Sequence, residues 1–215
     1  MKTTIPPRKV PKQERSRLKF DKMLSIAKDM LVEGGLDTFT TETLAKRAGT
    51  SIGSVYQYFP NKLSILSELI IEWRQDIESS LSAILDELSN YPIDTKERRN
   101  TLIGEMIDRF YTQTVTTPEQ LKLHAELFRA TAQSPELEIL EQQHNEFIAQ
   151  FVVHLMKQLG SDLDDKALID LAGYMYEAQN SVEAACKYDF SAYKRRMEWH
   201  KKASFSLLSK ECFND

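Results

Sequence analysis

Residues 39–59 read FTTETLAKRAGTSIGSVYQYF, and this stretch decides how the N-terminal part of the chain folds. Thr40 can cap a helix over residues 41–48, because its hydroxyl can accept a hydrogen bond from a free N–H group of the first turn. Gly49 then supplies a tight turn, and Ser51 can cap a second helix that starts directly after it. The pattern therefore predicts a helix, a short glycine-containing turn and another helix.

The second of these helices, expected over residues 52–58, has two unlike faces. At ~100° per residue, Val55 and Phe59 point to one side, with Ile52 and Tyr56 flanking them. The opposite side lacks a large apolar side chain and could read base edges in a major groove. It carries Gly53, Ser54 and Gln57, with Tyr58 at its edge.

Three hydroxyl side chains stand at the predicted helix starts, namely Thr40, Thr41 and Ser51. Hydroxyls and backbone N–H groups at such positions can bind phosphate. Spacing alone also allows a three-helix lobe with no role in DNA binding, so the motif is a hypothesis at this point.

Charge is distributed unevenly along the 215 residues, whose net charge is −4. Residues 1–62 hold twelve Lys and Arg against six Asp and Glu, whereas residues 63–215 hold sixteen against twenty-six. This asymmetry favours a polyanionic partner for the N-terminal end. A basic arm could follow a phosphate backbone or enter a minor groove, or could be a solvated tail; it contains Arg8, Lys9, Lys12, Arg15 and Arg17.

Apolar residues at spacings of three and four predict helices along the rest of the chain. One precedes the motif at about Lys12–Glu33, where Gly34 and Gly35 should end it. The others are expected at about Lys62–Leu88, Lys96–Thr114, Pro118–Ala132, Pro135–Leu159, Asp164–Lys187 and Phe190–Ser209. The expected fold is all-α, with a helix-turn-helix domain at 1–62 and a larger helical domain for ligand binding and dimerisation at 63–215.

The motif closely resembles the DNA-binding domain of the TetR family of repressors, above all in LAxxAGxSxGSVYxYFPNK over residues 44–62. The resemblance covers about residues 14–66, and the remaining ~150 residues match only as a helical tail of suitable length. It implies a regulator, typically a repressor, that binds a palindromic operator in double-stranded DNA and is released by a small-molecule effector.

The resemblance also implies roles for individual residues. Thr41, Tyr56 and Lys62 should contact phosphates. Bases or neighbouring phosphates should be read by Ser51, Ile52, Gly53, Ser54, Gln57 and Tyr58. Ile52 departs from the family, which usually has a polar or basic residue there, so it either contacts a thymine methyl group or packs.

The last two predicted helices carry apolar stripes that suit a homodimer interface, which the resemblance favours, or an intramolecular core. The stripes are Leu168, Leu171, Met175, Ala178, Val182 and Ala185, and Phe190, Tyr193, Met197, His200, Ser204 and Leu207. An effector pocket is expected among the middle helices, although ordinary core packing is the alternative for each candidate. The candidates are Trp73, Met106, Phe110, His124, Phe128, Phe147, Tyr174, Gln179 and Asn180.

The rival function is a metal enzyme in a helical bundle, which would need two Glu-x-x-His motifs. Only Glu141 and His144 form one, and no other catalytic or nucleotide-binding motif is present. Cys186 and Cys212 have no metal or redox spacing. No apolar run approaches the ~20 residues that span a bilayer. We therefore expect a cytoplasmic protein without a metal, a cofactor or a membrane partner.

Overall fold

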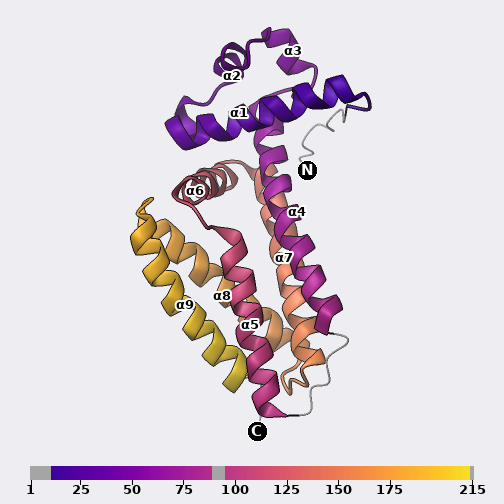
Figure 1. Cartoon of the computed structure of the whole chain (residues 1–215), viewed down its shortest axis with the longest axis vertical. Helices are drawn as coiled ribbons and strands as arrows, with labels where there is room; N and C mark the ends of the chain where they lie inside the picture. Colours follow the sequence, from indigo (N-terminus) through magenta and orange to yellow (C-terminus); the bar gives the residue numbers. More distant parts are fainter. Residues whose placement is uncertain (1–10, 89–94, 214–215) are drawn as a thin grey trace. The chain divides into compact units, whose positions relative to one another are not determined.

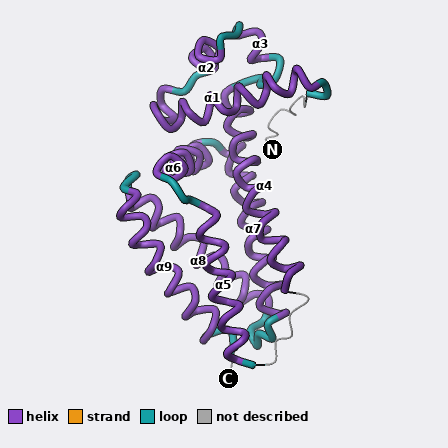
Figure 2. Tube along the Cα trace, in the orientation of Figure 1, coloured by secondary structure: helices purple, strands orange, loops and turns teal. Residues whose placement is uncertain are grey.

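The computed structural model describes residues 11–88 and 95–213, and all regular structure in these ranges is helical (Figure 1). Short loops join the helices (Figure 2). The helices are α1 (Glu14–Thr38), α2 (Thr41–Ala48), α3 (Ile52–Tyr56), α4 (Lys62–Leu88), α5 (Lys96–Thr114), α6 (Pro118–Gln133), α7 (Pro135–Gln158), α8 (Asp165–Cys186) and α9 (Phe190–Lys210). The prediction of an all-α fold with an N-terminal helix-turn-helix is confirmed. Arg8 and Lys9 of the basic arm lie outside the described residues.

The chain divides into two compact units. The first contains Met1–Trp73 and Lys122–Gln142, and the second contains Arg74–Leu121 and Gln143–Asp215. Helices α4, α6 and α7 therefore each begin in one unit and end in the other. The predicted domain boundary at residue 62 stays a prediction.

The first unit has a hydrophobic core that all three N-terminal helices share. Phe39, Leu44, Val55 and Phe59 are fully buried in it. The stacked rings of Phe20 and Phe59, with centroids 4.8 Å apart, attach the segment after α3 to α1. Side chains from α6 and α7 join the same core, which explains why residues far along the chain belong to this unit; they are Leu127, Ala130 and Leu137.

The end of α1 differs from the sequence prediction. Gly35 has φ 72° and ψ 178°, so it breaks the helix as predicted. One further turn then follows up to Thr38, because Leu36 turns back into the core and is buried. Glycine is required at this kink, since a Cβ would combine a strained positive φ with a contact of 3.2 Å to Oε2 of Glu126.

The second unit is a helical bundle in which α9 packs beside both α5 and α8 (Figure 1). Leu168 of α8 and Tyr193, Met197 and Ser204 of α9 are buried inside it. The α9 stripe therefore serves largely the intramolecular core, the second of the two predicted alternatives. Within the described residues, no helix is long and apolar enough to cross a membrane.

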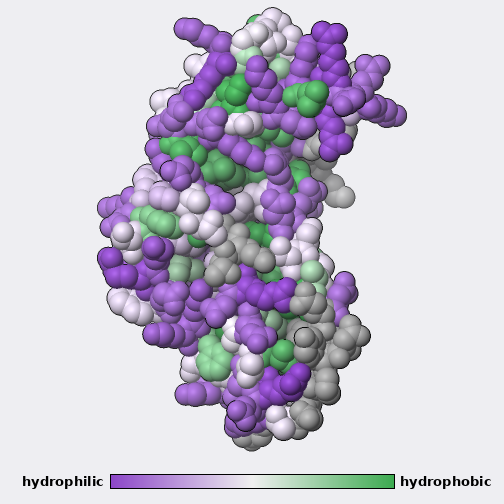
Figure 3. Space-filling model, in the orientation of Figure 1, coloured by the Kyte–Doolittle hydropathy of each residue, from purple (hydrophilic) through white to green (hydrophobic). Residues whose placement is uncertain are grey.

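Large apolar side chains that stay exposed are spread over both units. Hydrophilic side chains dominate the face drawn in Figure 3, with hydrophobic ones in small separate groups. In the second unit the exposed apolar residues lie on the last two helices and the turn between them, and they are Ile169, Tyr174, Tyr188 and Trp199.

Candidate functional site

Local hydrogen bonds fix the start of α2 as predicted. The Thr40 hydroxyl accepts from the Thr43 N–H at 3.1 Å, and the Thr43 hydroxyl accepts from the Thr40 N–H at 3.1 Å. This is a reciprocal capping box, in which Thr43 takes the place usually held by Glu or Gln. The predicted cap at Thr40 is confirmed. The second half of the capping box, in which Thr43 binds the Thr40 N–H, was not predicted.

The turn between α2 and α3 also follows the prediction. Gly49 has φ 66° and ψ 37°, and Thr50 N–H donates to Ala45 O at 3.0 Å. This left-handed residue ends α2 and reverses the chain. The Ser51 hydroxyl accepts from the Ser54 N–H at 3.1 Å, so Ser51 caps α3.

Helix α3 and the residues directly after it, Gln57–Phe59, separate buried anchors from exposed groups. Val55 and Phe59 are buried, while Gly53 and Gln57 are exposed. Ile52 is 37% exposed and Tyr56 is 46% exposed, so neither is part of the core that they were expected to flank. We call the four exposed residues, Ile52, Gly53, Tyr56 and Gln57, the recognition surface.

Two other predicted contacts of this helix are partly occupied by the protein itself. Tyr58 is half-buried, and its ring meets the Phe20 ring edge-on at 6.0 Å. Ser54 is half-buried, and its hydroxyl lies 2.9 Å from the Ser51 hydroxyl.

The structure brings together two residues that the resemblance assigns to phosphates. The Thr41 hydroxyl lies 3.3 Å from the Tyr56 hydroxyl, which links the first turn of α2 to α3. Thr41 is buried, so the Tyr56 hydroxyl is the more accessible of the two groups. A phosphate oxygen could be bound here by Tyr56, oriented by Thr41.

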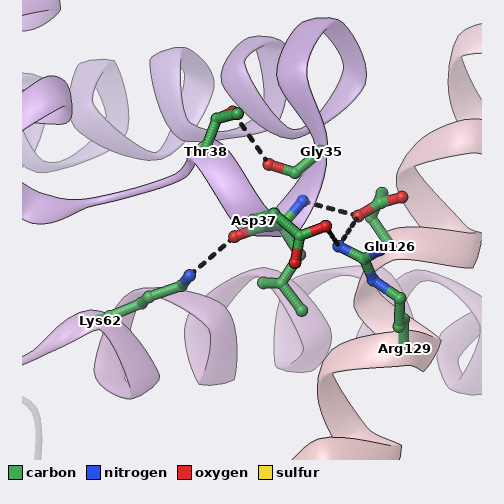
Figure 4. Close-up of polar contacts among 7 residues, drawn as sticks. Gly35, Asp37, Thr38, Lys62, Glu126 and Arg129 are labelled. Atoms are coloured by element: carbon green, nitrogen blue, oxygen red, sulfur yellow. Dashed lines mark hydrogen bonds and ion pairs between the residues drawn. The ribbon is translucent and has the colours of Figure 1, made fainter.

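Lys62, the third predicted phosphate contact, has a protein partner that the sequence did not reveal. Its ammonium donates to the Leu36 carbonyl at 2.8 Å (Figure 4). The same ammonium lies 5.7 Å from the centre of the Phe39 ring. Burial lowers the pKa of Lys62, and the nearby Asp37 opposes that shift. A lysine has three donors, so this bond leaves capacity for a phosphate.

The second unit contains a partly open cavity of about 60 Å³ whose walls are mainly apolar. Three of the predicted effector contacts line it, namely Met106, Phe110 and Gln179. The other lining residues come from α4, α5, α7, α8 and α9, and they are Leu81, Ile107, Tyr111, Ile148, Phe151, Val152, Leu155, Ala172, Met175, Tyr176 and Leu208. The sequence missed this set because it is assembled from five separate helices.

The remaining candidates do not line this cavity. Tyr174 is 60% exposed, because Ala172, Met175 and Gln179 occupy the inward face of α8 and Tyr174 projects from another face. Its expected place in a pocket wall is therefore wrong for this cavity. Phe147 and Asn180 are half-buried elsewhere in the second unit.

Trp73, His124 and Phe128 belong to the first unit. The Trp73 and His124 rings lie against each other, with centroids 4.1 Å apart.

A buried polar network adjoins the cavity. The Tyr111 hydroxyl lies 2.9 Å from Nε2 of His200 and 3.3 Å from the Ser204 hydroxyl. Burial raises the pKa of Tyr111 to about 12 and lowers the pKa of His200. Gln179 donates to Glu183 at 3.1 Å. Tyr111 and Gln179 thus offer the cavity polar groups that are already hydrogen-bonded.

The histidine of the single Glu-x-x-His motif has a different partner. His144 is buried, and its Nδ1 lies 3.1 Å from Oε1 of Glu78 on α4. Among the described residues, no three His, Cys, Asp or Glu side chains are grouped so that they could hold a metal ion.

Comparison with known proteins finds similarity mainly in the N-terminal part of the chain. Residues 23–69 match the family model for bacterial regulatory proteins of the tetR family. The HTH-type transcriptional regulator YdeS of Bacillus subtilis is 29% identical over 91 residues, which are 40% of this chain and 46% of YdeS. The nucleoid occlusion factor SlmA of Haemophilus ducreyi is 41% identical over 51 residues, which are 24% of this chain and 25% of SlmA. Each match thus spans less than half of the relative.

Solved structures share the fold over most of the chain. A TetR transcriptional regulator from Legionella pneumophila has a TM-score of 0.62 at 14% identity, covering 90% of this chain and 97% of its own. SmeT, the repressor of the Stenotrophomonas maltophilia multidrug efflux pump SmeDEF, has a TM-score of 0.62 at 16% identity. The match covers 91% of this chain and 90% of SmeT. GusR of Salmonella enterica has a TM-score of 0.65 at 14% identity, covering 94% and 99%. The chain therefore shares its fold with these proteins.

Proposed function

Residues 23–69 belong to the tetR family of bacterial regulatory proteins, and on this premise we propose that the chain is a DNA-binding transcriptional regulator, in the first instance a repressor. The observation that carries the proposal is the recognition surface. It is free of charge and exposes an amide, a hydroxyl and a glycine on a helix that Val55 and Phe59 fix to the core. Such groups can read base edges in the major groove. With DNA as the partner, the expected compartment stays the cytoplasm.

Two substitutions should distinguish the residue that reads a base from the residue that binds a phosphate. Gln57→Ala should relax discrimination at one base pair by ~1–3 kcal/mol, because an amide makes direct contacts with base edges. Lys62→Ala should weaken binding to all sites alike and flatten the dependence of affinity on salt, because a phosphate contact acts by counterion release. Selection from random DNA, followed by titrations at several salt concentrations, checks both. Selected sites without an inverted repeat, or equal shifts of specificity in both variants, would contradict the assignment.

Ile52 is proposed to contact a thymine methyl group, because an aliphatic side chain that is 37% exposed on the recognition surface has such a partner in the major groove. Replacing single thymines of the operator by deoxyuridine removes only that methyl group. At one position the replacement should weaken DNA binding by the wild-type protein several-fold, because burial of one carbon contributes ~0.8 kcal/mol or more. The same replacement should leave DNA binding by the Ile52→Ala variant unchanged. Equal losses in the two proteins at every thymine would assign Ile52 to packing alone.

We infer a homodimer through α8 and α9, since a two-fold dimer matches an inverted repeat. The buried stripe of α9 is not available for it, so the interface must use the outward faces of these helices. Those faces carry Tyr174 and Trp199 beside the small residues Gly173, Ala184 and Ala203, all exposed. Aromatic side chains such as these are enriched in protein interfaces.

We infer that the cavity of the second unit takes a neutral, largely apolar effector. Its volume of about 60 Å³ is well below the ~300–1,000 Å³ of ligand pockets, so the effector must widen it. A ligand that weakens DNA binding must itself bind the DNA complex more weakly by the same factor, about 5–150-fold. Native mass spectrometry would identify a co-purified ligand. Titrating it against free and operator-saturated protein would then measure the factor, and equal affinities would exclude release by the ligand.

A further inference from the structure

Two oppositely charged side chains bind the backbone of one residue near the end of α1, Leu36. Its N–H donates to Oε2 of Glu126 at 2.6 Å, and its carbonyl accepts from Nζ of Lys62 at 2.8 Å (Figure 4). We call this arrangement the Leu36 clamp. Glu126 belongs to α6 and Lys62 is the first residue of α4, so the clamp joins three helices of the first unit.

Glu126 is an unusual residue at this place, because its side chain is only 4% exposed. A buried carboxylate is costly unless it is hydrogen-bonded and paired with a positive charge. Here Arg129, one turn further along α6, lies 3.1 Å from the same Oε2 atom and 3.2 Å from Asp37. An apolar side chain would fill the same volume at lower cost, so the carboxylate suggests a role in fixing one geometry.

The clamp acts on the short segment of chain that links α1 to α2. Gly35 kinks the chain inside α1, and the N–H of the next residue, Leu36, donates to the Glu126 carboxylate. Four residues later, Thr40 caps α2, and between them Phe39 is completely buried. A displacement of Leu36 should therefore also displace the start of α2.

We propose that Glu126 is a positioning residue for DNA binding, which through the Leu36 N–H makes the placement of the helix-turn-helix depend on α6. This rests on the proposed function and deepens it. Helix α6 carries Glu126, so a shift of α6 withdraws the acceptor from Leu36. Loss of the clamp lowers the affinity for DNA while the chain stays folded.

Two conservative substitutions separate the reach of the acceptor from its charge. Glu126→Asp keeps the charge but is one methylene shorter, so its oxygen withdraws from the Leu36 N–H. Glu126→Gln keeps the reach and an acceptor oxygen but loses the charge. A matched control is Glu72→Ala, which removes an exposed ion pair between α4 and α1 in the same unit, 2.7 Å from Lys28.

The measurements are operator affinity, the free energy of unfolding, and hydrogen exchange at the Leu36 amide in the free protein. We expect Glu126→Asp to lose about tenfold or more in affinity, since a protein whose helix-turn-helix is in the binding geometry only part of the time binds more weakly by that fraction. Exchange at Leu36 should accelerate in the same variant. Glu126→Gln should stay within about threefold of the wild type in affinity, and Glu72→Ala within about twofold.

Several results would overturn the inference. One is a folded Glu126→Asp variant that binds the operator with wild-type affinity. Another is a loss of operator affinity in Glu126→Gln as large as that in Glu126→Asp. A third is a Glu126→Asp variant that no longer folds, because Glu126 would then contribute to stability only. If the wild type bound no selected DNA, the proposed function would fail. Exchange at Leu36 would then still report whether the clamp exists.

Discussion

Trp199→Glu should separate the proposed homodimer into monomers and lower the affinity of the protein for an inverted-repeat operator by about 10²–10⁴-fold. Trp199 is 66% exposed on α9, and an aromatic side chain of this size is a typical centre of a protein interface. A glutamate there would place an unpaired charge in the proposed interface. Each monomer carries one recognition surface, so separating the two copies removes the gain from binding both half-sites together.

Sedimentation and DNA titration of the same preparations test this. Ile139→Glu is the matched control, because Ile139 is an exposed apolar residue, 37% exposed, on α7 rather than on the proposed interface. It should leave both the mass in solution and the operator affinity unchanged. A dimeric Trp199→Glu protein would place the interface elsewhere, and a monomeric wild type would remove the proposed dimer altogether.

Phe59→Ala should lower the free energy of unfolding by about 3–5 kcal/mol, the usual cost of truncating a buried phenylalanine. The Phe59 side chain is fully buried, and its ring stacks on Phe20, so the substitution leaves a void where the segment after α3 joins the core. DNA binding should be lost with it, because the recognition surface then has no fixed support.

Tyr56→Phe is the counterpart on the exposed side of α3. It removes the hydroxyl that lies 3.3 Å from Thr41, and because Tyr56 is largely exposed, the free energy of unfolding should change by less than about 1 kcal/mol. DNA affinity should nevertheless fall by several-fold through the lost phosphate contact, at every sequence alike. Denaturant unfolding together with DNA titration measures both variants. A destabilised Tyr56→Phe, or a fully stable Phe59→Ala, would reverse the assigned roles of the two aromatic residues.

The helices and the helix-turn-helix could be predicted from local sequence patterns alone. The caps at Thr40 and Ser51 and the left-handed turn at Gly49 were predicted because their hydrogen bonds join residues three to five positions apart. The burial of Val55 and Phe59 was predicted because helical periodicity places them on one side of a short helix.

Contacts between residues that are far apart in the sequence could be identified only from the tertiary structure. Glu126 and Leu36 are 90 positions apart, and no local pattern connects a glutamate of α6 with the backbone at the end of α1. The cavity needed the rotation of α8 about its own axis, which turns Gln179 inward and Tyr174 outward. The apolar stripe of α9 suited a core and an interface equally, and its packing beside α5 and α8 assigned it largely to the core. Periodicity fixes which residues share a helix face, but the partner of that face depends on contacts among all the helices at once.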